Sequence, residues 1–276
     1  MAIVRTVIIL ALVGLILGGS AFFAYELYWK PKRLDREDRA ASSKEPMAVR
    51  HYSLPAFEKA EGLQRAGDIQ GARGAWDEFI QSYPDSPKIS EAKAALGGIN
   101  TGLLLSPNPS PDKTSYSVGK GDSLVKIASK FKSNPELIFR VNNMQTINLK
   151  IGQQLVIPQL DVSVVVDRKA RTVRLLNRGQ FFKEYQIVAL KTAAGPGSAQ
   201  TKVTDKVALR DSKRVAFGDK NYLGSERVIM LGSGGLSIRG FREGGEGAPP
   251  PGIVVVQPDV EEIFLLVSRG TPVTIQ

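Results

Sequence analysis

The sequence predicts a multidomain α+β protein in which several small folded units follow one N-terminal membrane-spanning helix. Three observations lead to this fold class. Nineteen consecutive residues, Thr6 to Ala24, carry no charge. Apolar residues then recur at helical spacing after Leu54, and short apolar runs separated by glycine-rich turns fill residues 160–276. The 16 prolines and 27 glycines favour small units joined by linkers over one large core.

The composition excludes several classes of enzyme. The chain has no cysteine, and therefore no disulfide, no thiolate nucleophile and no cysteine-ligated metal. Its one histidine, His51, stands in a polar stretch without a partner motif, so we expect no metal and no cofactor. A net charge of +10 favours an anionic polymer or surface as neighbour. Nucleic acid is not the expected partner, because the basic residues are spread over every segment without an aromatic-basic platform.

Residues 1–29 form the expected membrane anchor. At ~1.5 Å per helical residue, the uncharged run from Thr6 to Ala24 spans about 28 Å, close to the hydrocarbon thickness of a bilayer. Aromatic residues typical of a membrane interface follow it directly: Tyr25, Tyr28 and Trp29. The alternative is a cleaved signal peptide with its cleavage site among the small residues 18–21. We favour the uncleaved anchor because the apolar run continues beyond those residues, and either interpretation begins export.

Residues 30–53 read as a charged, polar stalk, and residues 54–103 as a helical hairpin with a further helix. Gly67-Asp68 marks the turn between two amphipathic helices. The string from Ala60 to Pro84, with its L-x-x-A-G-D, A-x-x-x-W and Y-P, resembles a tetratricopeptide-type hairpin. Such units bury their faces by stacking on neighbours, so a single one is expected to pack on another domain, on a second copy or on a partner. The plainer interpretation is a helical spacer whose core contains Trp76 and Phe79.

Residues 104–114 form a proline-rich linker and mark a domain boundary. Residues 115–159 then predict strand, helix, helix and strand in that order. The segment contains G-D-S-L at 121–124, I-A at 127–128, V-N-N at 141–143 and G-Q-Q-L-x-I-P at 152–158. With these motifs it resembles the LysM family. From Thr114 to Pro158, six Lys or Arg stand against two acidic residues, which favours attraction to an anionic cell wall.

The LysM resemblance implies a βααβ module that binds glycans containing N-acetylglucosamine, which in bacteria usually means peptidoglycan. In that family the glycan lies in a shallow groove between the first strand-helix loop and the second helix-strand loop. The glycan-binding positions carried over are Gly121, Asp122, Ser123, Leu124, Asn142, Asn143, Met144 and Ile147. Asp122 and Asn142 are also typical capping and turn residues.

Residues 160–276 predict a mostly β domain, with one helix over Asp259 to Val267 before a final strand. Several stretches resemble the L,D-transpeptidase (YkuD) family, above all D-V-E-E-I-F-L-L-V-S-R-G-T-P-V-T-I at 259–275. That family uses a cysteine in S-H-G-C-I-R and an upstream H-G histidine. An ungapped comparison backward from Gly270 places the nucleophile at Gly252, its neighbouring Arg at Val254 and the motif His at Pro250. The upstream H-G becomes Arg239-Gly240, and these five are the degenerate catalytic positions. With neither thiolate nor imidazole, the family chemistry is not expected, and we predict a pseudoenzyme.

The sequence therefore predicts a membrane-anchored, non-catalytic peptidoglycan-binding protein of the bacterial envelope. Its LysM module would tether or scaffold cell-wall machinery, with wall enzymes as possible partners of the helical hairpin. The expected location is the inner or cytoplasmic membrane, single-pass, with the C-terminal domains in the periplasm or otherwise outside the cytoplasm. This orientation follows from the resemblance and runs against the raw Lys/Arg count around the anchor. Two alternatives stay open: an interaction adaptor with incidental wall binding, and a wall transpeptidase or hydrolase with an unrecognised nucleophile.

Overall fold

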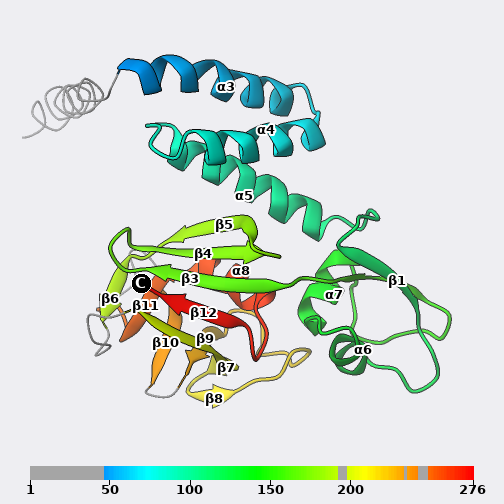
Figure 1. Ribbon diagram of the computed structural model, residues 1–276. Helices are drawn as coiled ribbons and strands as arrows, with labels where there is room; N and C mark the ends of the chain where they lie inside the picture. The colour runs from blue at the N-terminus through cyan, green and yellow to red at the C-terminus, as the bar shows by residue number, and fades with distance from the viewer. Residues whose placement is uncertain (1–46, 192–197, 233–234, 242–247) are drawn as a thin grey trace, which may run out of the picture.

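The computed structural model describes residues 47–191, 198–232, 235–241 and 248–276. The expected anchor at residues 1–29 and most of the expected stalk lie outside these residues. Within them, no helix combines the length and the apolar character that a membrane crossing requires. The described chain is a mixed α+β structure with a helical unit, a small βααβ module and a larger mostly-β domain (Figure 1).

Three helices form the N-terminal unit: α3 (Met47–Arg65), α4 (Ile69–Ser82) and α5 (Ile89–Leu105). Helix α3 begins inside the segment expected to be stalk, so residues 47–53 are helical. The turn before α4 forms where predicted, because the Asp68 side chain accepts a hydrogen bond from the Gly71 backbone N–H at 2.9 Å. The core centres on Trp76, whose ring meets Phe57 edge-on at 4.8 Å and whose Nε1 donates to Gln64 at 2.8 Å.

The helical unit packs on the C-terminal domain of its own chain. Helix α5 lies along strand β5 (Gln180–Gln186), as Figure 1 shows. The Asn100 side-chain amide donates to the Phe182 carbonyl at 2.9 Å, and Lys93 pairs with Glu184 at 3.1 Å. Gly97 sits so close to the sheet that an added Cβ would lie 2.8 Å from the Lys183 side chain. Of the neighbours that the sequence left open for this hairpin, another domain of the same chain is the one observed.

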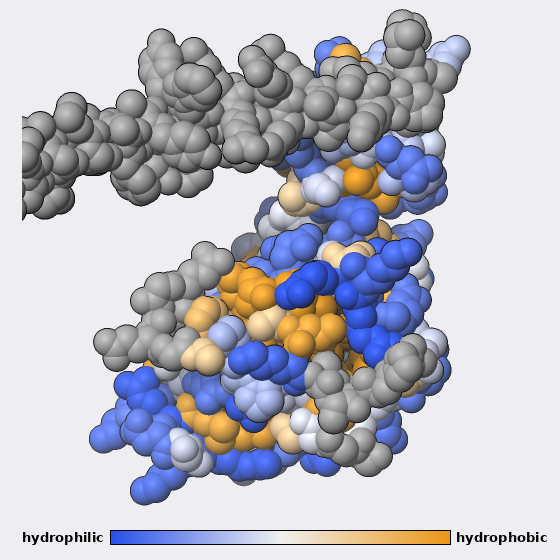
Figure 2. All heavy atoms as spheres, turned by 90° about the vertical axis from the view of Figure 1, so that its left-hand side faces the viewer, coloured by the Kyte–Doolittle hydropathy of each residue, from blue (hydrophilic) through white to orange (hydrophobic). Residues whose placement is uncertain are grey.

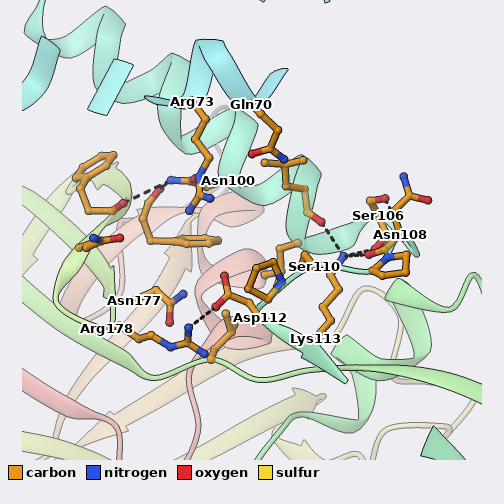
Figure 3. Close-up of a pocket in the computed structure, with 18 residues that line it drawn as sticks. Gln70, Arg73, Asn100, Ser106, Asn108, Ser110, Asp112, Lys113, Asn177 and Arg178 are labelled. Carbon is orange, nitrogen blue, oxygen red and sulfur yellow. Dashed lines mark hydrogen bonds and ion pairs between the residues drawn. The ribbon is translucent and has the colours of Figure 1, made fainter. Parts of the chain in front are cut away.

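The proline-rich linker is held to its surroundings. The Lys113 ammonium donates to the backbone carbonyls of Leu103, Ser106 and Asn108, which caps the end of α5. Beside it lies a cavity of about 430 Å³ between α4, α5, the linker and the turn before β5 (Figure 3). Arg178 on that turn pairs with Asp112 of the linker at 2.8 Å. The linker therefore joins the helical unit to the β domain through fixed contacts.

The βααβ module consists of β1 (Lys113–Ser117), α6 (Leu124–Lys130), α7 (Pro135–Val141) and β2 (Gln154–Pro158). Strands β1 and β2 pair antiparallel, and the order of elements is the one predicted. The side chains of Ser123 and Asn134 accept the N-cap hydrogen bonds of α6 and α7, respectively. The module's core contains Val118, Leu124, Ile127, Ala128, Ile138, Leu155 and Ile157.

The C-terminal domain is a ten-stranded sheet with one helix, α8 (Gln257–Leu266), packed against it. Its strands are β3 (Val162–Asp167), β4 (Thr172–Asn177), β5, β6 (Ala189–Lys191), β7 (Ala199–Arg210), β8 (Lys213–Arg214), β9 (Glu226–Leu231), β10 (Leu236–Phe241), β11 (Gly252–Val256) and β12 (Pro272–Ile275). They lie in the order β5-β4-β3-β12-β7-β9-β10-β11-β6, with β8 beside β7. Two neighbouring pairs, β3 with β12 and β10 with β11, run parallel.

Helix α7 belongs to two cores at once. Ile138 packs inside the βααβ module, whereas Leu137 and Val141 join the core of the C-terminal domain. The Asn134 amide donates to the Leu265 carbonyl at 3.0 Å. The Tyr222 hydroxyl donates to the buried Glu136 carboxylate. The module is thus docked on the sheet domain, which the sequence did not predict.

Candidate glycan-binding site

The loop after β1 is joined to the turn before β2, at the end of the second loop that the sequence singled out. Beyond the β1–β2 pair, the Val118 N–H donates to the Gln153 carbonyl at 2.9 Å, and the Gly152 N–H donates back to the Val118 carbonyl at 2.8 Å. These bonds hold the loop after β1 against the turn before β2. The Lys126 ammonium donates to the Gly121 carbonyl at 2.8 Å and ties the first loop to α6. The site is therefore supported by hydrogen bonds from both strands and from a helix.

Asp122 shapes the first loop from within. Its Oδ2 accepts hydrogen bonds from the Gly119 backbone N–H and from the Tyr116 hydroxyl, both at 2.8 Å. The Gly119 bond is the largest cause, and the Tyr116 bond the second, of a lowered pKa of the Asp122 carboxyl. Gly121 next to it has φ +83°, a conformation that glycine adopts without strain. Asp122 is therefore a supporting residue of the loop.

The charge on Asp122 makes a testable contribution to stability. Because the folded pKa is lowered, the carboxylate stabilises the module above the unfolded pKa near 4, and this contribution is lost as the pH falls through the folded value. We expect Asp122→Asn to lower the free energy of unfolding by a constant amount above about pH 4, with a difference from wild type that shrinks below it. Urea unfolding followed across pH 2 to 7 measures this. A difference that persists unchanged to pH 2 would rule out the charge as its source.

Asn142 has a similar supporting role in the second loop. Its Nδ2 donates to the carbonyls of Ile138 and Val156 at 2.7 and 2.8 Å, and its Oδ1 accepts from the Val156 N–H at 2.7 Å. The side chain therefore joins the end of α7 to β2. Asn143 follows with φ +49°, a left-handed conformation that Asn tolerates better than most residues. Met144 packs against the module's core.

The predicted site residues divide by exposure. Gly121, Ser123, Asn143 and Ile147 are exposed, whereas the Leu124 side chain is buried in the core and turned away from solvent. Ile147 also lies against the C-terminal domain, since a Cβ on Gly218 would come within 2.9 Å of its Cδ1. Only some of the named side chains can therefore meet a ligand.

Two exposed apolar residues belong to this surface and were not predicted. Val125, the second residue of α6, is 63% exposed, and Ile151, in the turn before β2, is 74% exposed. Val125 lies outside the helix face formed by Leu124, Ile127 and Ala128. This position could have indicated from the sequence that its side chain is exposed. Exposed apolar side chains beside free backbone groups can receive the acetamido methyl and the apolar faces of a sugar.

The degenerate transpeptidase positions lie on or near strands β10 and β11. Arg239 is already engaged, because its Nε donates to Ser237 Oγ and its Nη1 to Glu226, both at 3.1 Å. Gly252 has φ +118°, and a Cβ there would lie 2.6 Å from the Ser237 carbonyl oxygen. The position aligned with the nucleophile therefore has no room for a side chain.

The remaining degenerate positions differ in their surroundings. A Cβ on Gly240 would lie 2.5 Å from Val260 Cγ1, and the Val254 side chain is fully buried. Pro250 is half-buried just before β11. Strands β6 and β11 lie at the left of Figure 1, and the face turned to the viewer in Figure 2 carries a gathering of apolar atoms on this domain. Across the four described ranges, no three His, Asp or Glu side chains gather to hold a metal ion.

Comparison with known proteins identifies the βααβ module. Residues 116–158, which make up this module, match the model of the LysM domain. The chain therefore contains a LysM domain at the position predicted. The match covers this module and neither of its neighbours. No curated protein matches the sequence.

Similar solved structures include several L,D-transpeptidases. One from Mycobacterium smegmatis shares 13% identity at a TM-score of 0.31, covering 46% of this chain and 64% of that one. L,D-transpeptidase 1 of Mycobacterium tuberculosis shares 11% at 0.30, covering 45% and 66%. One from Stackebrandtia nassauensis shares 11% at 0.31, covering 73% and 76%. This chain thus spans less than two thirds of the first two enzymes.

Proposed function

We propose that this chain is a non-catalytic peptidoglycan-binding protein of the bacterial envelope, which tethers or scaffolds cell-wall machinery through its LysM domain. The observation that carries the proposal is the LysM domain itself, on which the apolar side chains of Val125 and Ile151 are exposed. LysM domains are associated with glycans that contain N-acetylglucosamine. The chain's net charge of +10 further favours an anionic wall as its neighbour.

The proposed role is non-catalytic because the chain offers no activated nucleophile of the transpeptidase type. The sequence has no cysteine, and its one histidine, His51, precedes the LysM domain by more than 60 residues. The crowding around Gly252 supports the same proposal. Incubation of the full chain with tetrapeptide muropeptides is expected to leave their masses unchanged. A cross-linked or shortened product would instead support an enzyme with an unrecognised nucleophile.

The proposed location is the cytoplasmic membrane, with residues 1–29 as anchor and the folded domains outside the cytoplasm. The uncharged run and its aromatic flank support this proposal, and peptidoglycan is reached only from that side. A C-terminal fusion to a reporter that is active only in the cytoplasm tests it. Activity of that reporter would contradict the proposed orientation.

Wall binding is expected to depend on the apolar surface of the LysM loops. Ile151→Ser in the full chain is expected to weaken co-sedimentation with purified sacculi about tenfold, because an exposed apolar contact for the sugar is lost. Leu54→Ser is the matched control, since Leu54 is an exposed apolar residue on α3 outside the LysM domain.

The salt dependence of the same measurement separates specific binding from charge attraction. Specific glycan binding should persist at 1 M salt, where the Debye length falls to about 3 Å. If binding is lost at high salt, or if Ile151→Ser and Leu54→Ser both bind as wild type does, then positive charge alone holds the chain on the wall.

A further inference from the structure

A second cleft lies between the LysM domain and the C-terminal domain. It has a volume of about 630 Å³ and opens between the α6–α7 turn, strand β7 and the turn after α8. Figure 1 shows the chain between β8 and β9 reaching toward the LysM domain at this junction. Phe217 from that connection meets Phe139 of α7 at 5.5 Å and closes one side.

The cleft is lined by cations and by no acidic residue. Lys132 comes from the α6–α7 turn, Lys206 from β7 and Arg269 from the turn after α8. Two carboxylates outside the lining act on these cations. Asp205 pairs with Arg214 at 3.0 Å and also feels the charge of Arg269, and Glu136 pairs with Arg140 and acts on Lys206. Three positive side chains from three different elements therefore face one space without a neutralising partner in its lining.

Lys206 is the deepest of these cations. Its Nζ donates to the Val267 carbonyl at 2.6 Å and lies 4.5 Å from the centre of the Phe264 ring. An ammonium carries three N–H donors, and among the described residues one of them is used. Burial lowers the Lys206 pKa to about 7, against a raising influence of Glu136 and a further lowering by Arg227. A bound anion would complete the hydrogen bonding of Lys206 and favour its charged form.

A neutral donor is also unused here. The Ser133 hydroxyl oxygen is buried and has no hydrogen-bond partner in the described part of the chain, and Ser133 lines this cleft. An unpaired buried hydroxyl is destabilising unless a ligand or water satisfies it. The combination of cations, a free hydroxyl and apolar walls such as Phe264 and Ala208 fits a short peptide that ends in a carboxylate.

We propose that this cleft binds the carboxylate-bearing peptide stem of a peptidoglycan strand whose glycan is held by the LysM loops. The proposal rests on the proposed function. Helix α6 connects the two sites: Ser123 caps it at the glycan loop, and Ala128 and Ser129 line the cleft at its other end. At ~1.5 Å per residue its seven residues span about 10 Å. An extended four-residue peptide reaches about 13 Å, at ~3.3 Å per residue, and so covers that distance.

The test compares a disaccharide tetrapeptide with the same glycan freed of its peptide, each titrated into the full chain by calorimetry. Lys132→Gln/Arg269→Gln removes two cleft charges from exposed turns. We expect it to weaken binding of the disaccharide tetrapeptide about fivefold, while affinity for the peptide-free glycan stays unchanged. Lys213→Gln/Lys220→Gln removes two exposed charges outside the cleft and should change neither affinity. Lys206→Met should weaken binding of the peptide-bearing ligand about tenfold or more.

Three outcomes would overturn the proposal. The first is equal affinity of wild type for the two ligands, and the second is equal weakening by the cleft and control pairs. The third is displacement of the peptide by inorganic phosphate at equal concentration, which would show a general anion site. Failure of the proposed function is distinguishable, because wild type would then not bind the peptide-free glycan. The free tetrapeptide still tests the cleft in that case, since Lys132→Gln/Arg269→Gln should bind it about fivefold more weakly than wild type.

Discussion

Replacing Gly252 with cysteine is expected to destabilise the C-terminal domain without creating a nucleophile. Gly252 opens strand β11 with φ +118°, and an added Cβ would lie 2.6 Å from the Ser237 carbonyl oxygen on the adjacent strand β10. A side chain there must both adopt a strained backbone conformation and push two paired strands apart. We expect a loss of about 3 kcal/mol or more in the free energy of unfolding. Urea unfolding of the full chain measures it.

Gly270→Ala is the matched control for this prediction. Gly270 also has a positive φ, +89°, but an added Cβ would meet no atom within 4 Å. Its replacement should therefore cost only the conformational penalty, about 1 kcal/mol. The interpretation fails if Gly252→Cys is as stable as Gly270→Ala and reacts readily with thiol reagents, because position 252 would then be open. Adding Pro250→His to Gly252→Cys is expected to yield no transpeptidation.

The second large effect is expected from Asn142→Ala, which removes the link between α7 and β2. Three hydrogen bonds of 2.7 to 2.8 Å are lost, and the Val156 N–H and carbonyl are left without that partner. Each group left unsatisfied costs about 1–3 kcal/mol, so we expect the LysM domain to lose about 3 kcal/mol of stability. Amide hydrogen exchange resolved to residues 113–158 measures this. Binding to sacculi should fall in parallel, because the second loop loses its support.

Asn148→Ala serves as the comparison, since Asn148 is exposed in the same loop. Its replacement should change stability by less than about 0.5 kcal/mol. If Asn142→Ala retains wild-type exchange protection but no longer binds sacculi, then Asn142 contacts the glycan directly and its supporting role is secondary. This experiment thus separates the two roles that the sequence left together for this residue.

Much of the fold was predictable because local patterns and tertiary structure agree. The LysM segment carries its caps, its two helix faces and both strands within a short stretch, and each formed where expected. The short apolar runs at residues 162–166, 172–176, 227–231 and 236–239 form β3, β4, β9 and β10, and helix α8 lies within two residues of its predicted bounds. In these elements, the alternation or helical spacing of apolar residues predicts the structure without knowledge of the elements that pack against them.

Other elements could not be predicted for physical reasons. Strand β7 is the longest, yet a register shift between Val203 and Asp205 breaks its alternation, and Lys206 faces a cleft between domains. Strand β11 lies between two neighbours and is buried on both faces, so Val254 carries no alternating signal. The docking of α7 on the sheet was equally hidden, because Leu137 and Val141 look like ordinary core residues of the LysM domain.

The candidate site was predicted at the level of loops and not of side chains. Residue types that suit a glycan contact also suit a cap or a turn, and for Asp122 and Asn142 the local hydrogen bonds are the ones observed. Ile151 became a candidate only when its exposure was known, because the identity of an apolar residue does not reveal whether it is buried. For Val125, its position outside the apolar face of α6 was a signal in the sequence.

The contacts that hold the proline-rich linker determine how the molecule responds to tension. A proline-rich linker is ordinarily a semi-rigid spacer. Here Lys113 also fastens it to the end of α5, and α7 fastens the LysM domain to the sheet. Tension applied through a captured glycan strand would therefore load the α5–β5 contact and the α7 contact together, instead of straightening a flexible joint. In the described part of the chain, the reach from Met47 to the glycan loops is set by this rigid frame, so the protein would work as a spacer of fixed length.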